Sequence, residues 1–448
     1  MIPSSAYYLL TIAASVAASP FTTHRSDESI VPKLIITADN TVNGTIPPEH
    51  PQIASNALKV NINIANNYDN ERQMHAYVTG NDRGGHVVML STSGEFYYPN
   101  TSSEIPQPIP DNAKIAIPLN NRGSDHPTSL VIPDSIISGR VYIADGDIQF
   151  KVIYNKTENI ISLVQPSLTA PDDASANIAW GFVELTNEDQ GKIWANLSFV
   201  DWVSLVMGMR LTLGDGQVET VPGLEINALD SICDALDDQS ARDQQPWDKL
   251  CVRRVCESPS CQNKILRILS PNLYTSEHHD WMADYYTAYV NDVYAKYTNE
   301  NLIIHTQSLY GDVPCRVQGG TQLVCQGDSN PFPKPTTSDI WGCNSGSFRK
   351  IDVRHDNIKA RLCAAFTRTQ LLLPGGNITP ALGNDTYYTI DPTNHYSRIV
   401  HEYEIDGIGY AFAHDDVNPD GIPKADGTLT GPNPQLLEIF IGGGLGTL

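Results

Sequence analysis

Two acidic residues stand in the middle of strongly apolar segments. Glu184 lies in WGFVEL (180–185) and Asp201 lies in SFVDWVSL (198–205), and both segments have the pattern of a β-strand. Burial of a carboxylate costs free energy, so stability alone rarely accounts for two of them. Glycoside hydrolysis uses such a pair: one carboxyl group donates a proton to the leaving oxygen, and the other activates water or attacks the sugar. Because apolar neighbours raise a carboxyl pKa, Glu184 is favoured as the acid. The alternative is two half-buried acids satisfied by Arg, Lys or backbone donors.

Six N-glycosylation sequons and an apolar leader point to secretion. The sequons begin at Asn43, Asn100, Asn155, Asn196, Asn377 and Asn384. In an unbroken strand, Asn196 and Asp201 are five residues apart and face opposite sides, so we expect a glycan on Asn196 to point away from the carboxylate. Residues 1–18 combine an apolar run with small residues up to Ala18, which is typical of a signal peptide. These features predict a secreted, extracellular glycoprotein.

The chain contains eight cysteines, all in its middle part. They are Cys233, Cys251, Cys256, Cys261, Cys315, Cys325, Cys343 and Cys363. An even number in a chain with a leader predicts disulfides, although eight cysteines allow 105 pairings and the sequence selects none of them. A zinc site is the alternative, but the spacing of Cys251, Cys256 and Cys261 lacks the C-x-x-C motif.

Composition limits the class of partner. The 448 residues carry a formal net charge of −22, with 41% hydrophobic and 18% charged residues. An acidic chain without a basic patch repels phosphate polymers and anionic lipid surfaces, so we expect neither nucleic acid nor membrane as a partner. A neutral polysaccharide is compatible with this charge. The length predicts two domains of about 150–250 residues.

The periodicity of apolar residues changes near residue 216. From 32 to 215, short alternating runs separated by turn residues predict a β-barrel or sandwich. From 216 to 404, helical periodicity and the cysteines predict a mixed α/β domain, with helices within 221–239, 275–297 (capped by Thr275 or Ser276), 355–376 and 391–403. Strands return over 407–417 and 435–443. We therefore expect a β-rich, two-domain fold in which residues 405–448 complete the first domain and the second is inserted.

Other motifs are weaker. DVNPDG (416–421) resembles the start of a calcium loop, but Gly427 stands where a bidentate Glu is required, so a calcium-dependent adhesion protein is a remote alternative. His278, His279 and His401 are interpreted as core or surface residues, since VHEYE (400–404) lacks the H-E-x-x-H spacing, and GCNSG (342–346) does not match a nucleophile elbow. We expect no metal and no cofactor.

Several blocks together resemble glycoside hydrolase family 64, the β-1,3-glucanases related to thaumatin-like proteins. They are WGFVEL and ANLSFVDWVSL, SPNLYTSEHHDWMADYY and VYAKYT, IWGCNSGSF, IKARLCAAFTRTQLL, and NHYSRIVHEYEIDGIGYAFAHDDV. These blocks follow the family order over about residues 30–448. The resemblance implies a thaumatin-like β-barrel domain and a mixed α/β domain on either side of a wide groove that holds β-1,3-glucan.

The resemblance also implies site residues. It makes Glu184 the general acid and Asp201 the general base of an inverting enzyme. It implies that Thr186 and Trp194 line sugar subsites, that Asn187 contacts sugar unless this role is displaced to Glu188, and that Asp415 and Asp416 face the groove. The functional alternative is a thaumatin-like glucan-binding or defence protein without turnover. In either case we expect a monomer.

Overall fold

The computed structural model describes residues 35–36, 59–69, 72–110, 112–170, 172–187, 191–254, 264–421 and 426–443. Three predictions fall outside this part of the chain: the leader over residues 1–18, the sequon at Asn43, and the cysteines Cys256 and Cys261.

An eight-stranded antiparallel sheet forms the centre of the β-rich part of the molecule. Its strands follow the order β24-β13-β12-β9-β3-β4-β5, with β7 beside β3. Their bounds are β3 (Met74–Asn81), β4 (Val87–Leu90), β5 (Phe96–Tyr97), β7 (Ile117–Pro118), β9 (Ile136–Asp145), β12 (Trp180–Asn187), β13 (Lys192–Leu197) and β24 (Leu429–Pro432). All ten residues of β9 and all eight of β12 are buried, so the middle of this sheet is covered on both faces.

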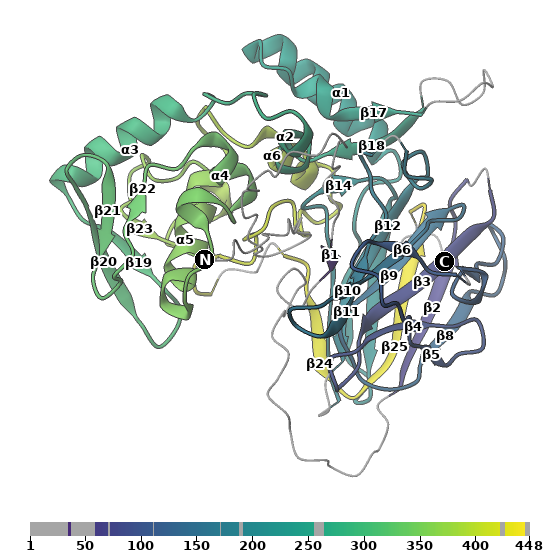
Figure 1. The fold of residues 1–448 in the computed structure, drawn as a ribbon. Coiled ribbons are helices and arrows are strands. Elements are labelled where there is room, and N and C mark those ends of the chain that lie inside the picture. Colours follow the sequence, from purple (N-terminus) through teal and green to yellow (C-terminus); the bar gives the residue numbers. More distant parts are fainter. Residues whose placement is uncertain are drawn as a thin grey trace.

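Two further sheets accompany it (Figure 1). One has the order β16-β15-β25-β2-β8, and the other has the order β1-β11-β10-β6. Their bounds are β1 (Ile35–Ile36), β2 (Val60–Asn66), β6 (Gln107–Pro108), β8 (Thr128–Ile132), β10 (Lys151–Asn155), β11 (Ile160–Val164), β15 (Met207–Leu213), β16 (Val218–Val221) and β25 (Pro434–Ile441). The C-terminal strand β25 lies between β15 and β2, so the end of the chain returns to the strands of its beginning.

The apolar core consists of two clusters, which the central sheet supplies from its two faces. Alternate residues of the central strands, such as Val141 and Val183, join Ile62, Leu211 and Ile439 in one large apolar cluster. Aromatic residues of the opposite face form a second cluster with residues of β10 and β11; among them are Tyr77, Tyr142, Phe150, Trp180, Phe182 and Trp202. Strand alternation thus supplies both clusters from the same strands.

The helices gather with two small sheets beside the large sheets (Figure 1). The small sheets have the orders β14-β18-β17 and β22-β21-β20-β19-β23. Their strands are β14 (Trp202–Val203), β17 (Cys251–Arg253), β18 (Ile265–Leu269), β19 (Leu302–His305), β20 (Asp312–Gln318), β21 (Gln322–Cys325), β22 (Phe332–Pro333) and β23 (Ile378–Thr379). The α-helices are α1 (Ala228–Asp243), α2 (Pro271–Glu277), α3 (Thr287–Asn299), α4 (Thr337–Gly342), α5 (Val353–Thr367) and α6 (His395–Glu402). Short 3-10 turns are η2 (Asn112–Lys114), η3 (Trp247–Leu250), η4 (Gly346–Phe348) and η5 (Asn384–Thr386).

The β-rich prediction is confirmed; α6 lies within its predicted segment, and α1, α5 and β25 overlap theirs. The single helix predicted over 275–297 is wrong, because α2 and α3 are separate. Ser270 caps α2, with Pro271 in its first turn. The Thr275 and Ser276 hydroxyls donate to backbone carbonyls of the preceding turn, so neither residue caps a helix.

Two predicted strands are also wrong. Of residues 198–205, only Trp202 and Val203 form a strand, and it belongs to a small sheet. Residues 407–417 form no strand beyond a single bridge at Tyr410. Here the Asp415 carboxylate accepts hydrogen bonds from the backbone N–H groups of Ala411 and Phe412, which closes the chain into compact turns.

Six of the eight cysteines form disulfides within the described residues. The pairs are Cys233–Cys251, Cys315–Cys325 and Cys343–Cys363. The disulfide prediction is therefore confirmed for these six. Among the described helices, none has the length and apolar character needed to cross a bilayer.

Candidate active site

The central strands bring four polar side chains into one row. Thr79 of β3 lies opposite Arg140 of β9, Arg140 lies opposite Glu184 of β12, and Glu184 lies opposite Asn196 of β13. Directly opposed residues point to the same face of a sheet. All four are at most 1% exposed, so a charged and polar row crosses the buried middle of the sheet.

Arg140 is the charge partner of Glu184. Its Nη2 and Nε lie 3.1 and 3.2 Å from Glu184 Oε1, and its Nη1 donates to Gln165 Oε1 at 3.3 Å. Desolvation lowers the pKa of Arg140, but Tyr142 and Glu184 outweigh it, so the guanidinium stays charged. The sequence argument placed Glu184 in a purely apolar environment. The structure also places a buried cation beside it.

Asp201 comes from a different element. β13 ends at Leu197, and Asp201 lies in a bend directly before β14, where its carbonyl accepts from the Ser270 backbone N–H at 2.8 Å. The side chain is buried. Desolvation raises the pKa of Asp201 well above its usual value; Arg140 lowers it, the charge of Glu184 raises it, and the Asn272 amide lowers it. The charge of Glu184 thus adds to desolvation in raising the pKa of Asp201.

Two residues predicted to contact sugar, Thr186 and Trp194, are neighbours of Glu184 in the sheet. Thr186 lies two residues after Glu184 and opposite Trp194, so both share the face of Glu184. Thr186 Oγ1 accepts from the Ser138 backbone N–H at 3.1 Å. Trp194 is half-buried, and Lys192 Nζ lies 4.4 Å from its ring centroid. Asn187 ends β12 as a buried residue, and Glu188 lies outside the described residues.

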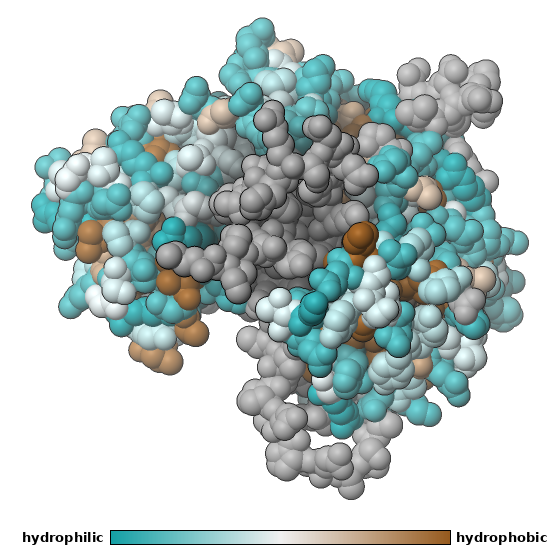
Figure 2. Space-filling model, in the orientation of Figure 1, coloured by the Kyte–Doolittle hydropathy of each residue, from teal (hydrophilic) through white to brown (hydrophobic). Residues whose placement is uncertain are grey.

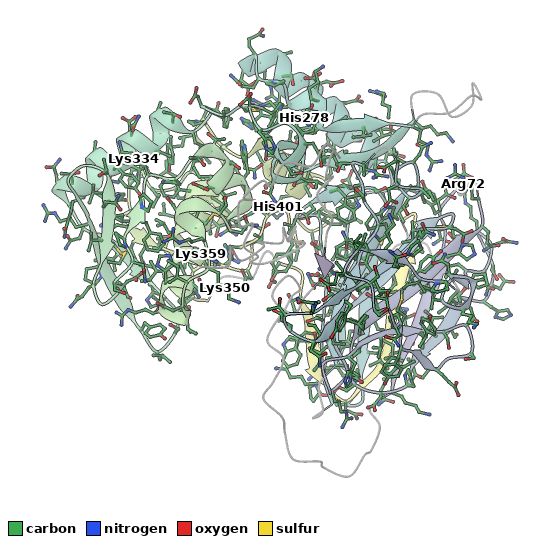
Figure 3. All side chains as sticks on the ribbon, in the orientation of Figure 1. Arg72, His278, Lys334, Lys350, Lys359 and His401 are labelled. Atoms are coloured by element: carbon green, nitrogen blue, oxygen red, sulfur yellow. A yellow bond between two sulfur atoms is a disulfide. The ribbon has the colours of Figure 1, made fainter. Side chains whose placement is uncertain are left out.

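Asp415 is held in an internal network of contacts, and its predicted place facing the groove stays a prediction. It is buried, and its carboxylate contacts Arg368 at 3.0 Å and His401 at 3.1 Å besides two backbone N–H groups. The charge of Asp415 is therefore compensated inside the protein by Arg368 and His401. His401, labelled in Figure 3, comes from α6 and contacts Glu404 on its other side at 2.7 Å. The next residue, Asp416, is exposed, and its role as a groove residue stays a prediction.

Asn196 does not fit the predicted glycan on the far side of the strand. The parity argument required an unbroken strand from Asn196 to Asp201, whereas the strand ends at Leu197. Asn196 faces the side of Glu184 and is 1% exposed, so its amide nitrogen is not accessible for attachment of an N-linked glycan. Among the other sequons, Asn100 and Asn384 are exposed, and Asn155 and Asn377 are partly exposed.

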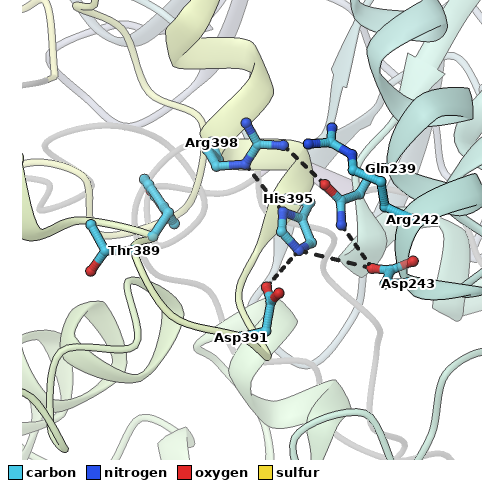
Figure 4. A pocket seen from close by; sticks show the side chains of 8 residues that line it. Gln239, Arg242, Asp243, Thr389, Asp391, His395 and Arg398 are labelled. Carbon is cyan, nitrogen blue, oxygen red and sulfur yellow. Dashed lines mark hydrogen bonds and ion pairs between the residues drawn. The ribbon is translucent and has the colours of Figure 1, made fainter.

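A polar pocket of about 250 Å³ contains none of the predicted site residues (Figure 4). Its lining consists of Gln239, Arg242, Asp243, Tyr388, Thr389, Asp391, His395 and Arg398. The His395 ring lies 2.9 Å from Asp391 and accepts from Arg398 at 3.1 Å, and Gln239 donates to Asp243 at 3.0 Å. Burial lowers the pKa of His395 to about 4. These side chains largely satisfy one another, and we assign the pocket no catalytic role.

The face shown in Figure 2 is largely hydrophilic, with apolar residues in separate spots. Within the described ranges, no group of three or more His, Cys, Asp or Glu side chains is arranged to hold a metal ion. In the calcium-loop candidate, Asp420 contacts His305 Nε2 at 3.0 Å and accepts from Gln307 at 2.9 Å.

Sequence reasoning missed three residues that shape the site: Arg140, Asn272 and Tyr396. Arg140 carried a signal, because a cation in the apolar strand segment SGRVYIADG is the counterpart of the acid in WGFVEL. Asn272 of α2 acts on Asp201, and the Tyr396 hydroxyl of α6 donates to the Phe199 carbonyl near it. Nothing in the local sequence of α2 or α6 indicates these long-range contacts.

Two interacting, buried carboxylates, one on a β-sheet and the other where that sheet meets helical elements, form the kind of centre that glycoside hydrolases use. The chain belongs to glycoside hydrolase family 64, because the family model described as β-1,3-glucanase matches residues 58–441. The resemblance seen in the sequence is thereby confirmed.

Individual relatives agree with this membership. The glucan endo-1,3-beta-glucosidase of Cellulosimicrobium cellulans is 26% identical over 309 residues, which cover 64% of this chain and 51% of that protein. The match thus spans about half the length of this relative. The crystal structure of a laminaripentaose-producing β-1,3-glucanase in complex with laminaritetraose has a TM-score of 0.73 and 26% identity, covering 86% of this chain and 98% of that chain. A β-1,3-glucanase domain from Clostridium beijerinckii, with a TM-score of 0.64, 20% identity and the same coverage, shows the fold alone.

Proposed function

We propose that this protein is an endo-type β-1,3-glucanase that hydrolyses laminarin-like β-1,3-glucan by inverting single displacement. Glu184 is the general acid and Asp201 is the general base. The observation that carries the proposal is the burial of both carboxylates, with Arg140 paired to Glu184 and the charge of Glu184 raising the pKa of Asp201. Family membership and the relatives described above support the reaction and the substrate class.

The protonation of the pair has a consequence for the mechanism. Catalysis requires the proton on Glu184 and the charge on Asp201. Arg140 contacts Glu184, and desolvation raises the pKa of Asp201. Because the two carboxyl groups interact, a bell-shaped pH profile reports the pair and not either residue.

Digestion of laminarin tests the activity. The purified protein is expected to release reducing ends, while Glu184→Gln and Asp201→Asn lower kcat by about 10²- to 10⁴-fold. Each substitution is nearly isosteric, so circular dichroism spectra should match those of the wild type. NMR of the first products should show the α-anomer, because inversion turns a β-linkage into an α-hydroxyl. A first product of β-configuration would reject the mechanism.

A second substrate assigns the two roles. The leaving group of a laminarioligosaccharide fluoride needs little protonation. Glu184→Gln should therefore still hydrolyse this fluoride but no longer hydrolyse laminarin. Asp201→Asn should lose both substrates, and azide should restore turnover by replacing the activated water. The opposite pattern would exchange the roles of the two residues.

Binding without turnover is the competing function. A thaumatin-like glucan-binding or defence protein needs a sugar-contacting face but gains nothing from two buried acids whose charges must be compensated. Laminarin retention on an affinity gel without release of reducing ends would favour the binding protein.

We propose further that the protein is secreted and monomeric and has two domains, one of them thaumatin-like, with the glucan groove between them. The disulfides support an oxidising compartment. Detection in culture medium of a chain cleaved near Ala18 tests secretion. A deglycosylated solution mass of a single chain, below the 49.1 kDa of the full sequence, tests the monomer.

A further inference from the structure

Asn196 is an unexplained polar side chain within the candidate active site. It is 1% exposed, and among the described residues neither its amide nitrogen nor its amide oxygen has a hydrogen-bond partner. An amide buried without partners costs free energy that a purely structural Asn avoids. The buried Asn394, for comparison, accepts a hydrogen bond from the Ser397 backbone N–H at 3.1 Å.

The position of Asn196 points to a use. It lies directly opposite Glu184 in the strand pair β12 and β13, and opposed side chains have Cβ atoms about 4.5–5.5 Å apart. Trp194 precedes it by two residues on the same face and lies opposite Thr186. The amide therefore stands beside the acid of the catalytic pair and next to two candidate sugar contacts.

The chemistry of the amide matches a sugar hydroxyl. A hydroxyl group both donates and accepts, and the Asn side chain offers two N–H donors and one carbonyl acceptor. The neighbouring Ser198 hydroxyl is also buried and has no hydrogen-bond partner within the part of the chain that the structure describes. A glucosyl unit that enters this row can satisfy both groups.

We propose that Asn196 is a substrate-binding residue that holds a hydroxyl of the glucosyl unit next to Glu184 during cleavage. This inference rests on the proposed glucanase function. It has a second consequence, because Asn196-Leu197-Ser198 is a sequon. The active protein must carry no glycan on Asn196, even when it is made in a host that glycosylates other sequons.

Kinetics of two variants test the proposal. Asn196→Ala removes the contact and is expected to lower kcat/KM on laminarin by roughly 10- to 100-fold, with kcat falling as well, because hydroxyl contacts strengthen in the transition state. Asn196→Asp has the same shape but adds a third carboxylate beside the pair. Like charges raise carboxyl pKa values, so the acidic limb of its pH–rate profile should move to higher pH.

Asn394→Ala is the matched control. It removes a buried Asn that caps α6, so its Tm should fall while its pH–rate profile stays unchanged. If wild-type protein releases no reducing ends from laminarin, the proposed function fails, whatever the variants do. If the wild type is active, unchanged kcat/KM in Asn196→Ala overturns this inference. If Asn196→Ala does not fold, an unshifted pH–rate profile in Asn196→Asp overturns this inference.

Glycopeptide mass spectrometry of active protein from a glycosylating host gives an independent readout. We expect Asn196 to be unmodified, with Asn100 and Asn384 as exposed comparison sites. A glycan on Asn196 in the fraction that hydrolyses laminarin would refute the proposal.

Discussion

Replacement of Arg140 tests how the buried acidic centre is stabilised. Arg140→Met keeps the length of the side chain and removes its charge, leaving Glu184 without its cation. The two side chains are 0% and 1% exposed, so water does not screen the loss. Removing one partner of a buried ion pair costs about 3–5 kcal/mol, because the other charge stays buried. At about 2–4 °C per kcal/mol for a domain of about 150–250 residues, the Tm of the domain that contains the sheet should fall by roughly 6–20 °C.

A double-mutant cycle isolates the pair. Tm is measured for Arg140→Met, for Glu184→Gln and for the double variant. Since the double variant buries neither charge, it should be more stable than the sum of the single losses predicts, by about 1–3 kcal/mol. Arg210→Met is the matched control, because the Arg210–Glu438 pair is 35% and 18% exposed. Solvent screening limits its expected cost to about 1 kcal/mol.

Two results would refute this reasoning. The first is additivity, in which the double variant loses the sum of the single losses. The second is a fall in Tm for Arg140→Met no larger than for Arg210→Met. Either result would mean that Arg140 does not compensate a buried charge on Glu184.

Three further predictions follow from the structure. Burial lowers the pKa of His401, but Glu404 and Asp415 raise it to about 10. The stability from this raised pKa is complete below about pH 6.5 and is lost as the pH rises to about 10, so the Tm deficit of His401→Gln should shrink over that range; a constant deficit would contradict this. Asp415→Asn should lower Tm by several degrees, whereas the exposed neighbour variant Asp416→Asn should change it by less than about 1 °C; equal losses would contradict the buried network. Trp194→Ala should raise KM for laminarin roughly 2- to 10-fold, and an unchanged KM would exclude ring stacking on sugar.

Local sequence was sufficient to predict an element wherever the element's own periodicity determines it. The two-residue alternation in VNINIAN is strand β2, and the three- to four-residue repeat of α1 is a 16-residue helix. It was insufficient where a distant group overrides the pattern. Residues 407–417 alternate like a strand, yet Asp415 binds its own backbone and the buried Arg368.

The sequence by itself showed two acidic residues within apolar segments, where selection for stability alone rarely places them. The order of its blocks identified the family. Only the tertiary structure decided which groups surround them. β-Sheet register set Arg140 and Asn196 on either side of Glu184, although they are 44 and 12 residues from it in sequence. The break after Leu197 moved Asp201 out of the sheet and next to Asn272 of α2. Strand parity cannot predict such positions, because it holds only within one continuous strand.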